Sequence, residues 1–542
     1  MLSDDYEEFT QSQQALLEKY VTNTTSHIFA LRNLPEVIKG ALFSRYSRSS
    51  LGLRTLLLKE FITNTDQSGF EEIAGSSENS DNQELAIKKA QNFYDRILDG
   101  YGDDSIGELG GAHLAVENIS MLAAKLIEDC RIGGSPLEKS TRYIYFDQKV
   151  NGEYLFYREP VLMTSAYRDL FVEASNLLFE TYGKLIGPLT KQFEERMPYD
   201  PNTSKGAYNA ALRAKVLDCL RGLLPAGTLT NMGMFGNGRF YEGLLHKMHC
   251  SNLTEMKEVG GRMHEELAKV IPSFVRRADK EHHTHKNFAQ FFEAQETELS
   301  VVASQAAVFE ARSKDAGVKL LASDPDAVTK VAAALIYPYS NKALHDLETI
   351  CKELSQEELE RILDAGSSAR ESRRHKSPRA LEHAFFTFEI LADFGIYRDL
   401  HRHRTLTQER QRLTCDYEYW MPEEIRGSDM EAAYHTAMKE AKIAYDTIAK
   451  ELPEEAQYVV PMAYNVRWYF HVNLRALQWL CELRSQAAGH PSYRLIAQEM
   501  AQQVCCRYPQ FERFFKFVDY GGYDMGRMGQ EQRKAEKANA QS

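Results

Sequence analysis

The chain has 542 residues, and its 77 Asp and Glu against 65 Lys and Arg give a formal net charge of −12. A chain of this length exceeds what one ordinary hydrophobic core encloses, so the sequence predicts two or more domains. The acidic balance argues against a chain-wide surface for nucleic acid or an anionic membrane. No apolar run approaches the length of a membrane span, so we expect no membrane contact.

The eight cysteines form no C-x-x-C pair, which predicts reduced thiols rather than disulfides or a Cys-based metal site. The N-terminal segment MLSDDYEEFTQSQQ is acidic and polar, unlike a cleavable export signal. Together these features predict a cytoplasmic protein.

Taken in chain order, the hydrophobic pattern is mainly helical. Apolar residues recur at helical spacing in residues 53–61, 118–128, 170–180, 254–270 and 476–483. Alternating aromatic and β-branched residues favour strands at residues 141–147 and 153–159. The sequence therefore predicts a helix-rich α+β fold.

Polar segments indicate where the chain divides. Residues 69–83 are typical of a loop, and residues 276–286 of a domain junction. The charged residues after Gly526 are typical of a frayed end. We therefore expect a first domain over residues 1–285, a second over residues 286–530 and a disordered tail over residues 531–542.

A local concentration of positive charge interrupts the acidic composition. Seven basic side chains lie within fifteen residues, against only Asp399 and Glu409: they are Arg398, His401, Arg402, His403, Arg404, Arg410 and Arg412. Clustered guanidiniums suit phosphate or carboxylate groups. The pattern predicts an anion site, with a solvated basic helix face as the alternative.

Two spacings recur in the two halves of the chain. Cys130 follows Ser105 by 25 residues, and Arg402 follows Ser377 by the same number. Asn237 and Asn473 each follow a proline, Pro225 or Pro461, by twelve residues. The same order of the same spacings predicts a duplication, with chance agreement of short helical patterns as the alternative.

The halves differ in length between these two blocks. Pro225 lies 95 residues after Cys130, whereas Pro461 lies 59 residues after Arg402. The first half therefore carries about 36 additional residues, which we place around Met163 to Tyr208.

The motifs resemble those of the flavin-dependent thymidylate synthases, whose signature is Arg-His-Arg, seven residues, then Ser-x-Arg-Tyr. The second half has the front of this signature, Arg402-His403-Arg404, after the segment SPRALEHAFFTFEI. The first half has the back of it in GGSPLEKSTRYIYFD. Neither half has both parts, and the resemblance therefore implies a site to which each half contributes.

The resemblance implies a role for each matching residue. The flavin-binding positions correspond to Ser377, Glu382, Arg402, His403, Arg404, Asn473 and Arg475, with Asn237 and Arg239 persisting in the first half. The nucleotide-binding positions correspond to Glu138, Ser140, Arg142, Arg221, Arg402 and Arg484. Of these, Arg484 would stabilise charge on the uracil ring, and Ser140 is the second candidate catalytic residue.

The losses in the two halves are complementary. Cys130-Arg131-Ile132 replaces Arg-His-Arg in the first half, and Met248 replaces the activating arginine. In the second half, Arg410, Arg412 and Thr414 stand at the Glu-x-Ser-x-Arg positions, and Gln457 stands where Arg221 has its counterpart. Replacing Met248 or Gln457 by alanine is accordingly expected to be nearly silent.

Three departures concern the substrate. Asp399 replaces a Gln of the family, a carboxylate that needs pairing with Arg398 or Arg402. His490 lies two residues later than the family's histidine, and Gly110-Gly111 stands where the second half has Glu382-His383.

The resemblance implies reductive methylation of dUMP to dTMP, with FAD as cofactor and NADPH and methylenetetrahydrofolate as co-substrates. It also implies a small-molecule nucleotide substrate and a homodimer whose four halves form a pseudo-tetramer. Two alternatives remain open. One is an enzyme of the same ancestry for another pyrimidine nucleotide, and the other is a non-catalytic scaffold that binds nucleotide or flavin.

Two further patterns, a run of histidines and a cysteine beside the basic cluster, have ordinary structural explanations that we favour. The segment Glu281 to His285 contains three histidines, but they are more typical of a solvated junction than of a zinc site, and we expect no metal. Cys415 follows the basic cluster without a group that would activate it, so we expect an inert thiol.

Overall fold

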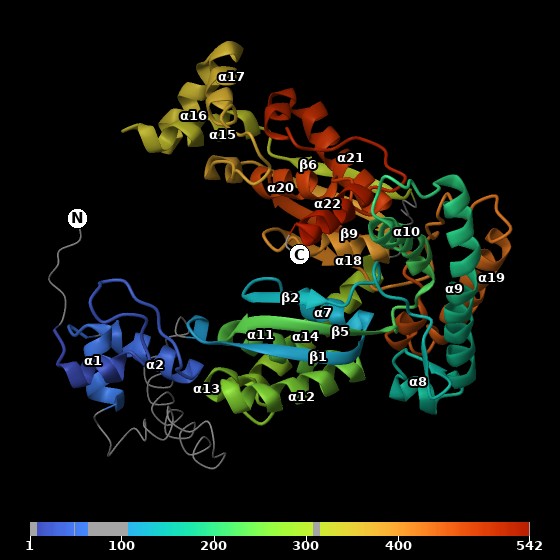
Figure 1. Cartoon of the computed structure of the whole chain (residues 1–542), viewed down its shortest axis with the longest axis horizontal. Coiled ribbons are helices and arrows are strands. Elements are labelled where there is room, and N and C mark those ends of the chain that lie inside the picture. Colours follow the sequence, from blue (N-terminus) through green and yellow to red (C-terminus); the bar gives the residue numbers. More distant parts are fainter. Residues whose placement is uncertain (1–7, 48, 63–106, 307–314, 541–542) are drawn as a thin grey trace. The chain divides into compact units, whose positions relative to one another are not determined.

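The computed structural model describes residues 8–47, 49–62, 107–306 and 315–540 (Figure 1). It forms two compact units that both draw on the first half of the sequence. Unit 1 comprises residues 1–117, 126–138 and 231–310, and unit 2 comprises residues 118–125, 139–230 and 311–542. The described helices contain none that is long and apolar enough to cross a membrane.

The first half builds a three-stranded sheet, most of which lies in unit 1. Its strands are β1 (Gly111–Ser120), β2 (Gly134–Glu138) and β5 (Leu229–Asn237), in the order β1-β5-β2. Strands β2 and β5 are antiparallel, with Gly134 opposite Gly236 and Glu138 opposite Met232. Helix α7 (Met121–Glu128) follows β1, whereas α11 (Gly238–Cys250) and α12 (Thr254–Val270) follow β5.

The second half builds a four-stranded antiparallel sheet in unit 2. Its strands are β6 (Gly317–Ser323), β7 (Phe385–Asp393), β8 (Thr407–Arg410) and β9 (Asn465–Asn473), in the order β6-β7-β9-β8. Strands β7 and β9 pair along their whole length, from Phe385 opposite Asn473 to Asp393 opposite Asn465. Helix α18 (Phe394–Leu400) follows β7, whereas α20 (Leu474–Arg484) and α21 (Pro491–Arg507) follow β9.

The core of the second sheet follows from the period of two along a strand. Phe386, Phe388 and Ile390 on β7 are fully buried, as are Phe470 and Val472 on β9. Alternate residues on each strand share one face, so these aromatic and branched side chains form one apolar layer that holds the strand ends in place.

Within the described residues the two halves share an arrangement of three strands, to which the second half adds β6. In each, a strand and a short helix precede a second strand, and the central strand β5 or β9 comes last and leads into the following helix pair. This agreement confirms the predicted tandem α+β fold. The repeated spacings arise because each interval measures the chain between equivalent strands and helices.

The two proline segments pair with each other within unit 2. Ala226 N–H donates to Val460 C=O at 2.8 Å, and Met462 N–H donates to Leu224 C=O at 2.9 Å. The second bond is the first one with the halves exchanged, since 236 residues separate each pair of equivalent positions. The two equivalent proline segments are therefore related to each other by a local pseudo-two-fold axis.

The remaining helices and strands have the following bounds. They are α1 (Gln11–Leu17), α2 (Glu36–Tyr46), α3 (Leu53–Leu56), β3 (Lys149–Val150), β4 (Glu153–Tyr154), α8 (Pro160–Thr164), α9 (Arg168–Arg196), α10 (Lys205–Leu220), α13 (Pro272–Val275), α14 (His283–Ala306), α15 (Ala327–Ile336), α16 (Leu344–Glu353), α17 (Gln356–Ala365), α19 (Glu431–Ile448) and α22 (Met528–Asn539). Short π- or 3₁₀-helical turns are at Leu57–Ile62, Arg221–Leu223, Arg276–Ala278, Tyr337–Tyr339, Arg379–His383, Glu455–Val459 and Pro509–Phe514.

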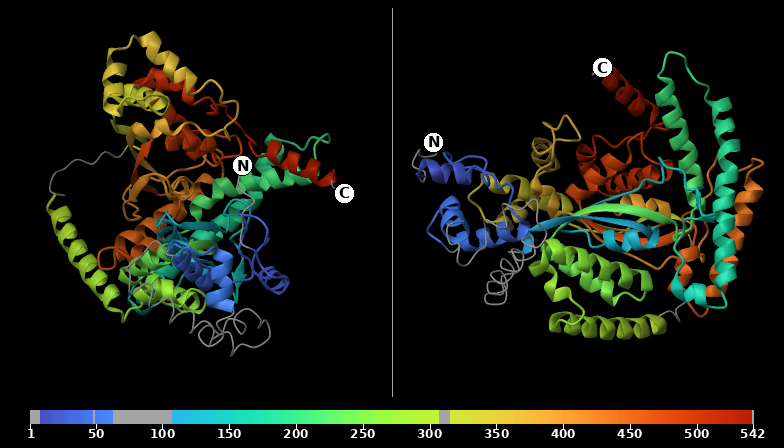
Figure 2. Two further views of the ribbon diagram at one scale, coloured as in Figure 1. Left: turned by 90° about the vertical axis from the view of Figure 1, so that its left-hand side faces the viewer. Right: turned by 60° about the horizontal axis from the view of Figure 1, so that its bottom comes forward.

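Two helices account for the greater length of the first half. Between β2 and β5 the chain forms the 29-residue α9 and then α10, which pack side by side (Figure 2). Between β8 and β9 the second half has only the 18-residue α19, which packs on α9. The predicted surplus around Met163 to Tyr208 corresponds to α8, α9 and the start of α10.

The predicted strand at residues 141–147 is wrong. Those residues form turns, and the exposed Tyr143, Ile144 and Tyr145 are consecutive rather than alternating. Arg142, immediately before them, is buried in an ion pair with Asp218, so the ion pair rather than a sheet ladder fixes the backbone here. At residues 153–159 only Glu153 and Tyr154 form a strand.

Other sequence expectations differ from the structure in their boundaries. Helix α12 spans the predicted residues 254–270, whereas the helix expected from residue 118 begins at Met121 because β1 extends to Ser120. The expected junction at residues 276–286 leads directly into α14 and lies inside unit 1. The loop expected at residues 69–83 lies outside the described residues.

The tail expected to be disordered contains helix α22. Its residues are mostly Glu, Gln, Lys, Arg and Ala, which are strong helix formers, and α22 packs on α10. High charge by itself predicts disorder, but the same side chains stabilise a helix when it can pack on a neighbouring helix.

Candidate functional site

A cavity of about 610 Å³ in unit 2 brings the predicted cofactor residues of the second half together. Its lining includes Ser377, Glu382, Arg402, His403, Arg404, Asn473, Arg475 and Arg484. These residues come from the segment before β7, from the turn after α18 and from the start and end of α20. The sheet brings them to one place because β7 and β9 pair from end to end.

Arg475 organises one wall of this cavity. Its Nη1 donates to Glu382 Oε1 at 2.6 Å, and its Nε donates to the backbone oxygen of Ser377 at 2.9 Å. The guanidinium thus ties α20 to the segment that precedes β7. The Ser377 hydroxyl is buried and has no hydrogen-bond partner within the described residues.

Arg484 and His403 form the polar contact at the other end of the cavity. Arg484 Nε donates to His403 Nε2 at 2.9 Å, so Nε2 is an acceptor and the proton of the neutral ring is on Nδ1. Burial, followed by the positive charge of Arg484, holds the pKa of His403 well below its usual value. The imidazole is therefore a neutral acceptor that orients the arginine.

Two arginines of the first half are held by carboxylates in the same unit, one of them buried (Asp218) and the other half-buried (Asp399). Arg142 Nε and Nη2 donate to Asp218 Oδ1 and Oδ2, each at 2.5 Å. Arg221 Nη1 donates to Asp399 Oδ2 at 2.9 Å. Asp399 belongs to the second half, so this ion pair joins residues that the sequence assigned to different halves.

Four arginines stabilise the negative charge of Asp399, and one of them, Arg221, contacts it directly. Burial alone would raise its pKa, but Arg221 and then Arg142, Arg484 and Arg402 hold it well below its usual value. From the sequence we expect Arg398 or Arg402 to pair with Asp399. In the structure its direct partner is Arg221. Four arginines with the two carboxylates of Asp218 and Asp399 leave a net charge of about +2, which suits a dianion such as a phosphate monoester.

Tyr493 links the two sets of arginines and was not singled out from the sequence. Its hydroxyl lies 3.5 Å from Arg142 Nη1, and its ring centroid lies 5.6 Å from Arg484 Cζ. It is on α21, nine residues after Arg484. No motif marks such a tyrosine, and only its place in the first turn of the helix after Gly489-His490-Pro491 distinguishes it.

His490 contacts the backbone of Asp218, the residue whose carboxylate pairs with Arg142. Its Nε2 lies 3.1 Å from the backbone oxygen of Asp218, while its side chain caps α21 by accepting from Ser492 N–H. Burial, followed by the charge of Arg221, lowers the pKa of His490 to about 3. The ring is neutral over the physiological range.

The other first-half candidates are placed separately. Glu138 is buried on β2 in unit 1, while the Ser140 hydroxyl accepts from Arg142 N–H at 3.3 Å. Asn237 and Arg239 lie in unit 1, where Arg239 Nη1 donates to Glu108 Oε1 at 2.7 Å. This pair repeats the pairing of Arg475 with Glu382, so the counterpart of Glu382 in the first half is Glu108 and not Gly110-Gly111, as the sequence alone suggests.

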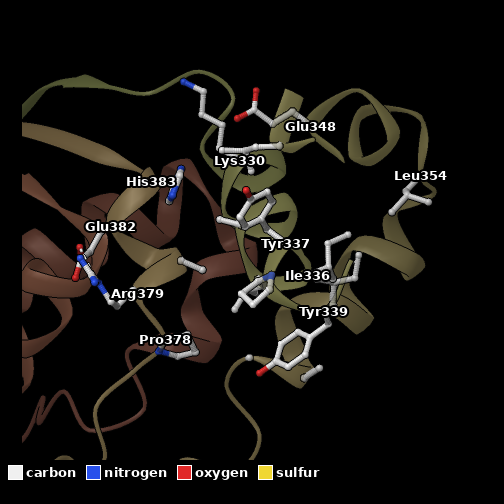
Figure 3. A pocket seen from close by; sticks show the side chains of 18 of the residues that line it. Lys330, Ile336, Tyr337, Tyr339, Glu348, Leu354, Pro378, Arg379, Glu382 and His383 are labelled. Carbon is white, nitrogen blue, oxygen red and sulfur yellow. Dashed lines mark ion pairs between the residues drawn. The ribbon is translucent and has the colours of Figure 1, made fainter. Parts of the chain in front are cut away.

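A second cavity, of about 1480 Å³, shares a lining residue with the first, and Figure 3 shows this second cavity from close by. It is bounded by α15, α16, α17 and the turn Arg379–His383. Tyr337 and Tyr339 extend from one side, and Lys330 and Glu348 lie at one end. Glu382 lines both cavities, so the carboxylate paired with Arg475 stands at their boundary.

Asn473 has a structural contact besides its place in the cavity. Its side-chain oxygen accepts from Ala476 N–H at 2.9 Å and caps α20. Replacing Asn473 by alanine is expected to cost about 1 kcal/mol of unfolding free energy, whereas serine keeps the cap and costs little. If the amide also contacts the flavin, both variants lose flavin in the absorption spectrum. Urea unfolding with equal losses for Ala and Ser would contradict the cap.

Asp393 predicts a pH dependence of stability. It caps α18 through Ile396 N–H at 2.9 Å, and burial raises its pKa to about 7 against the lowering effect of Arg221. The folded state therefore retains a proton that the unfolded state releases above about pH 4, and this group's contribution to stability falls as the pH rises through 7.

The variant Asp393→Asn keeps the cap and removes the titration. Between pH 5 and 8, the wild type is expected to lose on the order of 2–4 kcal/mol relative to this variant. Urea unfolding at pH 5, 6.5 and 8 measures the difference. Parallel dependences on pH would exclude a protonated Asp393 in the fold.

Within the histidine-rich segment only His285 is buried, whereas Glu281 and His283 are exposed, and Cys415 is buried. His285 Nδ1 lies 2.9 Å from His246 Nδ1, with the rings stacked. Burial raises the pKa of Cys415 well above its usual value. Among the described residues, no group of three or more His, Cys, Asp or Glu side chains is arranged to hold a metal ion.

Comparison with known proteins agrees with the duplicated architecture. A family model described as thymidylate synthase complementing protein matches residues 60–273 and again residues 319–510. A UPF0159 protein from Chlamydia pneumoniae is 56% identical over 528 residues, which cover 97% of this chain and 98% of the relative. A UPF0159 protein from Thermoplasma acidophilum is 32% identical over 530 residues, which cover 92% of this chain and 99% of the relative.

A shorter relative matches part of the chain. A flavin-dependent thymidylate synthase from Clostridium tetani is 29% identical over 222 residues, which cover 36% of this chain and 84% of the relative. Nearly the whole of that relative thus corresponds to a part of this chain. The chain therefore belongs to the thymidylate synthase complementing protein family, and it carries the family's domain twice in tandem.

Proposed function

We propose that this chain is a flavin-dependent thymidylate synthase, a methyltransferase that converts dUMP to dTMP with FAD, methylenetetrahydrofolate and NADPH. The observation that carries the proposal is the group of four arginines around Asp399. Arg142 and Arg221 come from the first half, whereas Arg402 and Arg484 come from the second. One chain thereby assembles the nucleotide-binding set that neither half has alone.

The cavity residues fit a flavin dinucleotide. Arg402, Arg404 and Arg475 provide guanidiniums for phosphates, and the buried Ser377 hydroxyl offers a hydrogen bond that the described residues leave unused. The two adjoining cavities meet at Glu382, which suits an elongated cofactor with a ring at each end. When bound, FAD supplies the hydride that reduces the transferred methylene group.

The protein's own residues bind and polarise the nucleotide. Arg142 and Arg221 hold the phosphate by charge-assisted hydrogen bonds, for which the net charge of about +2 is suited. Arg484 donates to a uracil carbonyl oxygen and stabilises the negative charge that develops when the ring reacts. His403 accepts from Arg484 and keeps the guanidinium in one orientation.

Two experiments test the proposed function. Protein purified intact should show visible flavin absorption or bind added FAD, and its gene should rescue a thymidine-requiring bacterium. Absence of flavin binding would exclude the enzyme and favour a nucleotide-binding scaffold. Light scattering tests the accompanying proposal of a homodimer, and cell fractionation tests the cytoplasmic location.

The presence of Asp399 favours a second candidate function. In this alternative the chain is an enzyme of the same ancestry that methylates another pyrimidine nucleotide. A half-buried carboxylate beside Arg221 changes the charge that the substrate meets relative to the family's Gln. Flavin binding without rescue of the thymidine requirement, followed by turnover of a different pyrimidine nucleotide, would favour this candidate over dUMP.

A further inference from the structure

Three cations at the edge of the smaller cavity have no carboxylate or hydrogen-bond partner among the described residues. We call Arg373, Arg374 and Lys376 the cationic strip; all three line the cavity. Within the part of the chain that the structure describes, their side chains form no hydrogen bond or ion pair. Arg374 and Lys376 are exposed. Positive side chains left unpaired beside a cavity favour an anionic group on whatever enters it.

Arg370 fixes the backbone that carries the cationic strip. Arg370 Nη1 and Nη2 donate to the carboxylate of Glu482, which is fully buried, at 2.6 and 2.5 Å. The same guanidinium donates to the backbone oxygens of His375 at 2.8 Å and Arg373 at 3.2 Å. The strip is therefore presented by a preformed loop, which lowers the entropy cost of binding.

An aromatic surface lies at the first residue of the strip. Trp479 on α20 lines the cavity and is 42% exposed, and Arg373 Cζ lies 5.9 Å from its ring centroid. An exposed tryptophan offers a flat apolar face to a ring of the ligand. From the cavity outward, the order of chemistry is thus a polar pocket, an aromatic face and a row of cations.

The number of cations in the strip distinguishes between kinds of anion. The strip lies on a turn, in which His375 N–H donates to Ser372 C=O at 2.9 Å, and three cations on one turn suit a ligand that carries several separate negative charges. Guanidiniums for phosphates are already present inside the cavity, at Arg402, Arg404 and Arg475. The strip is therefore additional to the phosphate-binding set.

We propose that the cationic strip binds the γ-linked glutamate chain of the folate co-substrate, with the benzoyl ring against Trp479 and the pterin in the cavity. The inference rests on the proposed function, since it assigns one part of a folate to each of the three surfaces. Each added glutamate brings one carboxylate, and exposed ion pairs of this kind are individually weak and sensitive to salt.

Calorimetric titration of the flavin-loaded full-length protein with folic acid and with folic acid pentaglutamate tests the inference. The pentaglutamate is expected to bind about tenfold more tightly at low salt, from several weak pairs acting together. In the triple variant Arg373→Gln, Arg374→Gln, Lys376→Gln, this ratio should fall below about two. A control with the exposed Lys342, Lys439 and Lys450 changed to glutamine removes the same charge elsewhere and should keep the wild-type ratio.

The other outcomes separate the inference from the proposed function. Equal affinity of the wild type for both folates overturns the strip and leaves the proposed function intact. If neither folate binds, both the inference about the strip and the proposed function are overturned. Loss of flavin absorption from the triple variant but not from the control would mean that these cations hold the dinucleotide, which overturns the assignment to folate.

Discussion

Changing Arg484 to alanine is expected to lower the rate of dTMP formation by about 10²–10³-fold, the usual effect of removing a donor that stabilises developing negative charge. Arg484 is fixed by its hydrogen bond to the neutral His403 and by the ring of Tyr493. The loss should appear in kcat, because the interaction strengthens as charge develops. Steady-state kinetics on protein with intact flavin absorption measures it.

The matched control is at the corresponding position of the first half. Met248 is 1% exposed, so we expect Met248→Leu to retain both fold and activity. The earlier expectation that Met248→Ala is nearly silent applies to chemistry alone, because truncating a buried methionine costs about 2–5 kcal/mol of stability. An Arg484→Ala variant with the activity of Met248→Leu would exclude Arg484 from the reaction.

Gln457→Ala is likewise a poor silent variant. Gln457 is buried, and its side-chain oxygen accepts from Leu413 N–H at 3.2 Å. Alanine would leave a buried backbone donor without its partner, which costs about 1–3 kcal/mol. The residue that replaced the second half's arginine has thus taken a structural role.

The sequence was sufficient for the architecture because duplication leaves a record in spacing. Intervals such as Ser377 to Arg402 span a strand and its helix, and such local units have fixed lengths. The prediction of a strand at residues 141–147 is wrong because it rests on a local pattern. The backbone there is determined by the pairing of Arg142 with Asp218, 76 positions later. Propensity cannot detect a contact of that separation.

The residues of the site also fall into two groups: those that the sequence could identify and those that it could not. Arg142, Arg221, Arg402 and Arg484 could be selected from the sequence because each belongs to a motif. Asp218 and Tyr493 could not, since they belong to none and meet Arg142 only in the folded chain. Asp399 stands out in the sequence as a departure from the family, but its partner Arg221 lies 178 residues earlier and cannot be identified from the sequence.

Changing Asp218 to alanine is expected to destabilise the protein by about 3–5 kcal/mol, the effect of removing one member of a buried ion pair. Asp218 is 5% exposed and Arg142 is 7% exposed, so water cannot replace the lost carboxylate. Arg142 would retain only long contacts, at 3.4 Å to Ala488 C=O and 3.5 Å to the Tyr493 hydroxyl. Urea unfolding measures the change in the free energy of unfolding.

A double variant separates the pair's structural role from its proposed part in binding. Arg142→Met with Asp218→Leu replaces both charges by apolar groups, which restores most of the stability when such groups pack well. It also removes the guanidinium that we assign to the phosphate, so dUMP binding should stay lost while the fold recovers. Recovery of dUMP affinity together with stability would show that Arg142 supports the structure only, and would leave Arg221 as the first half's cation for the phosphate.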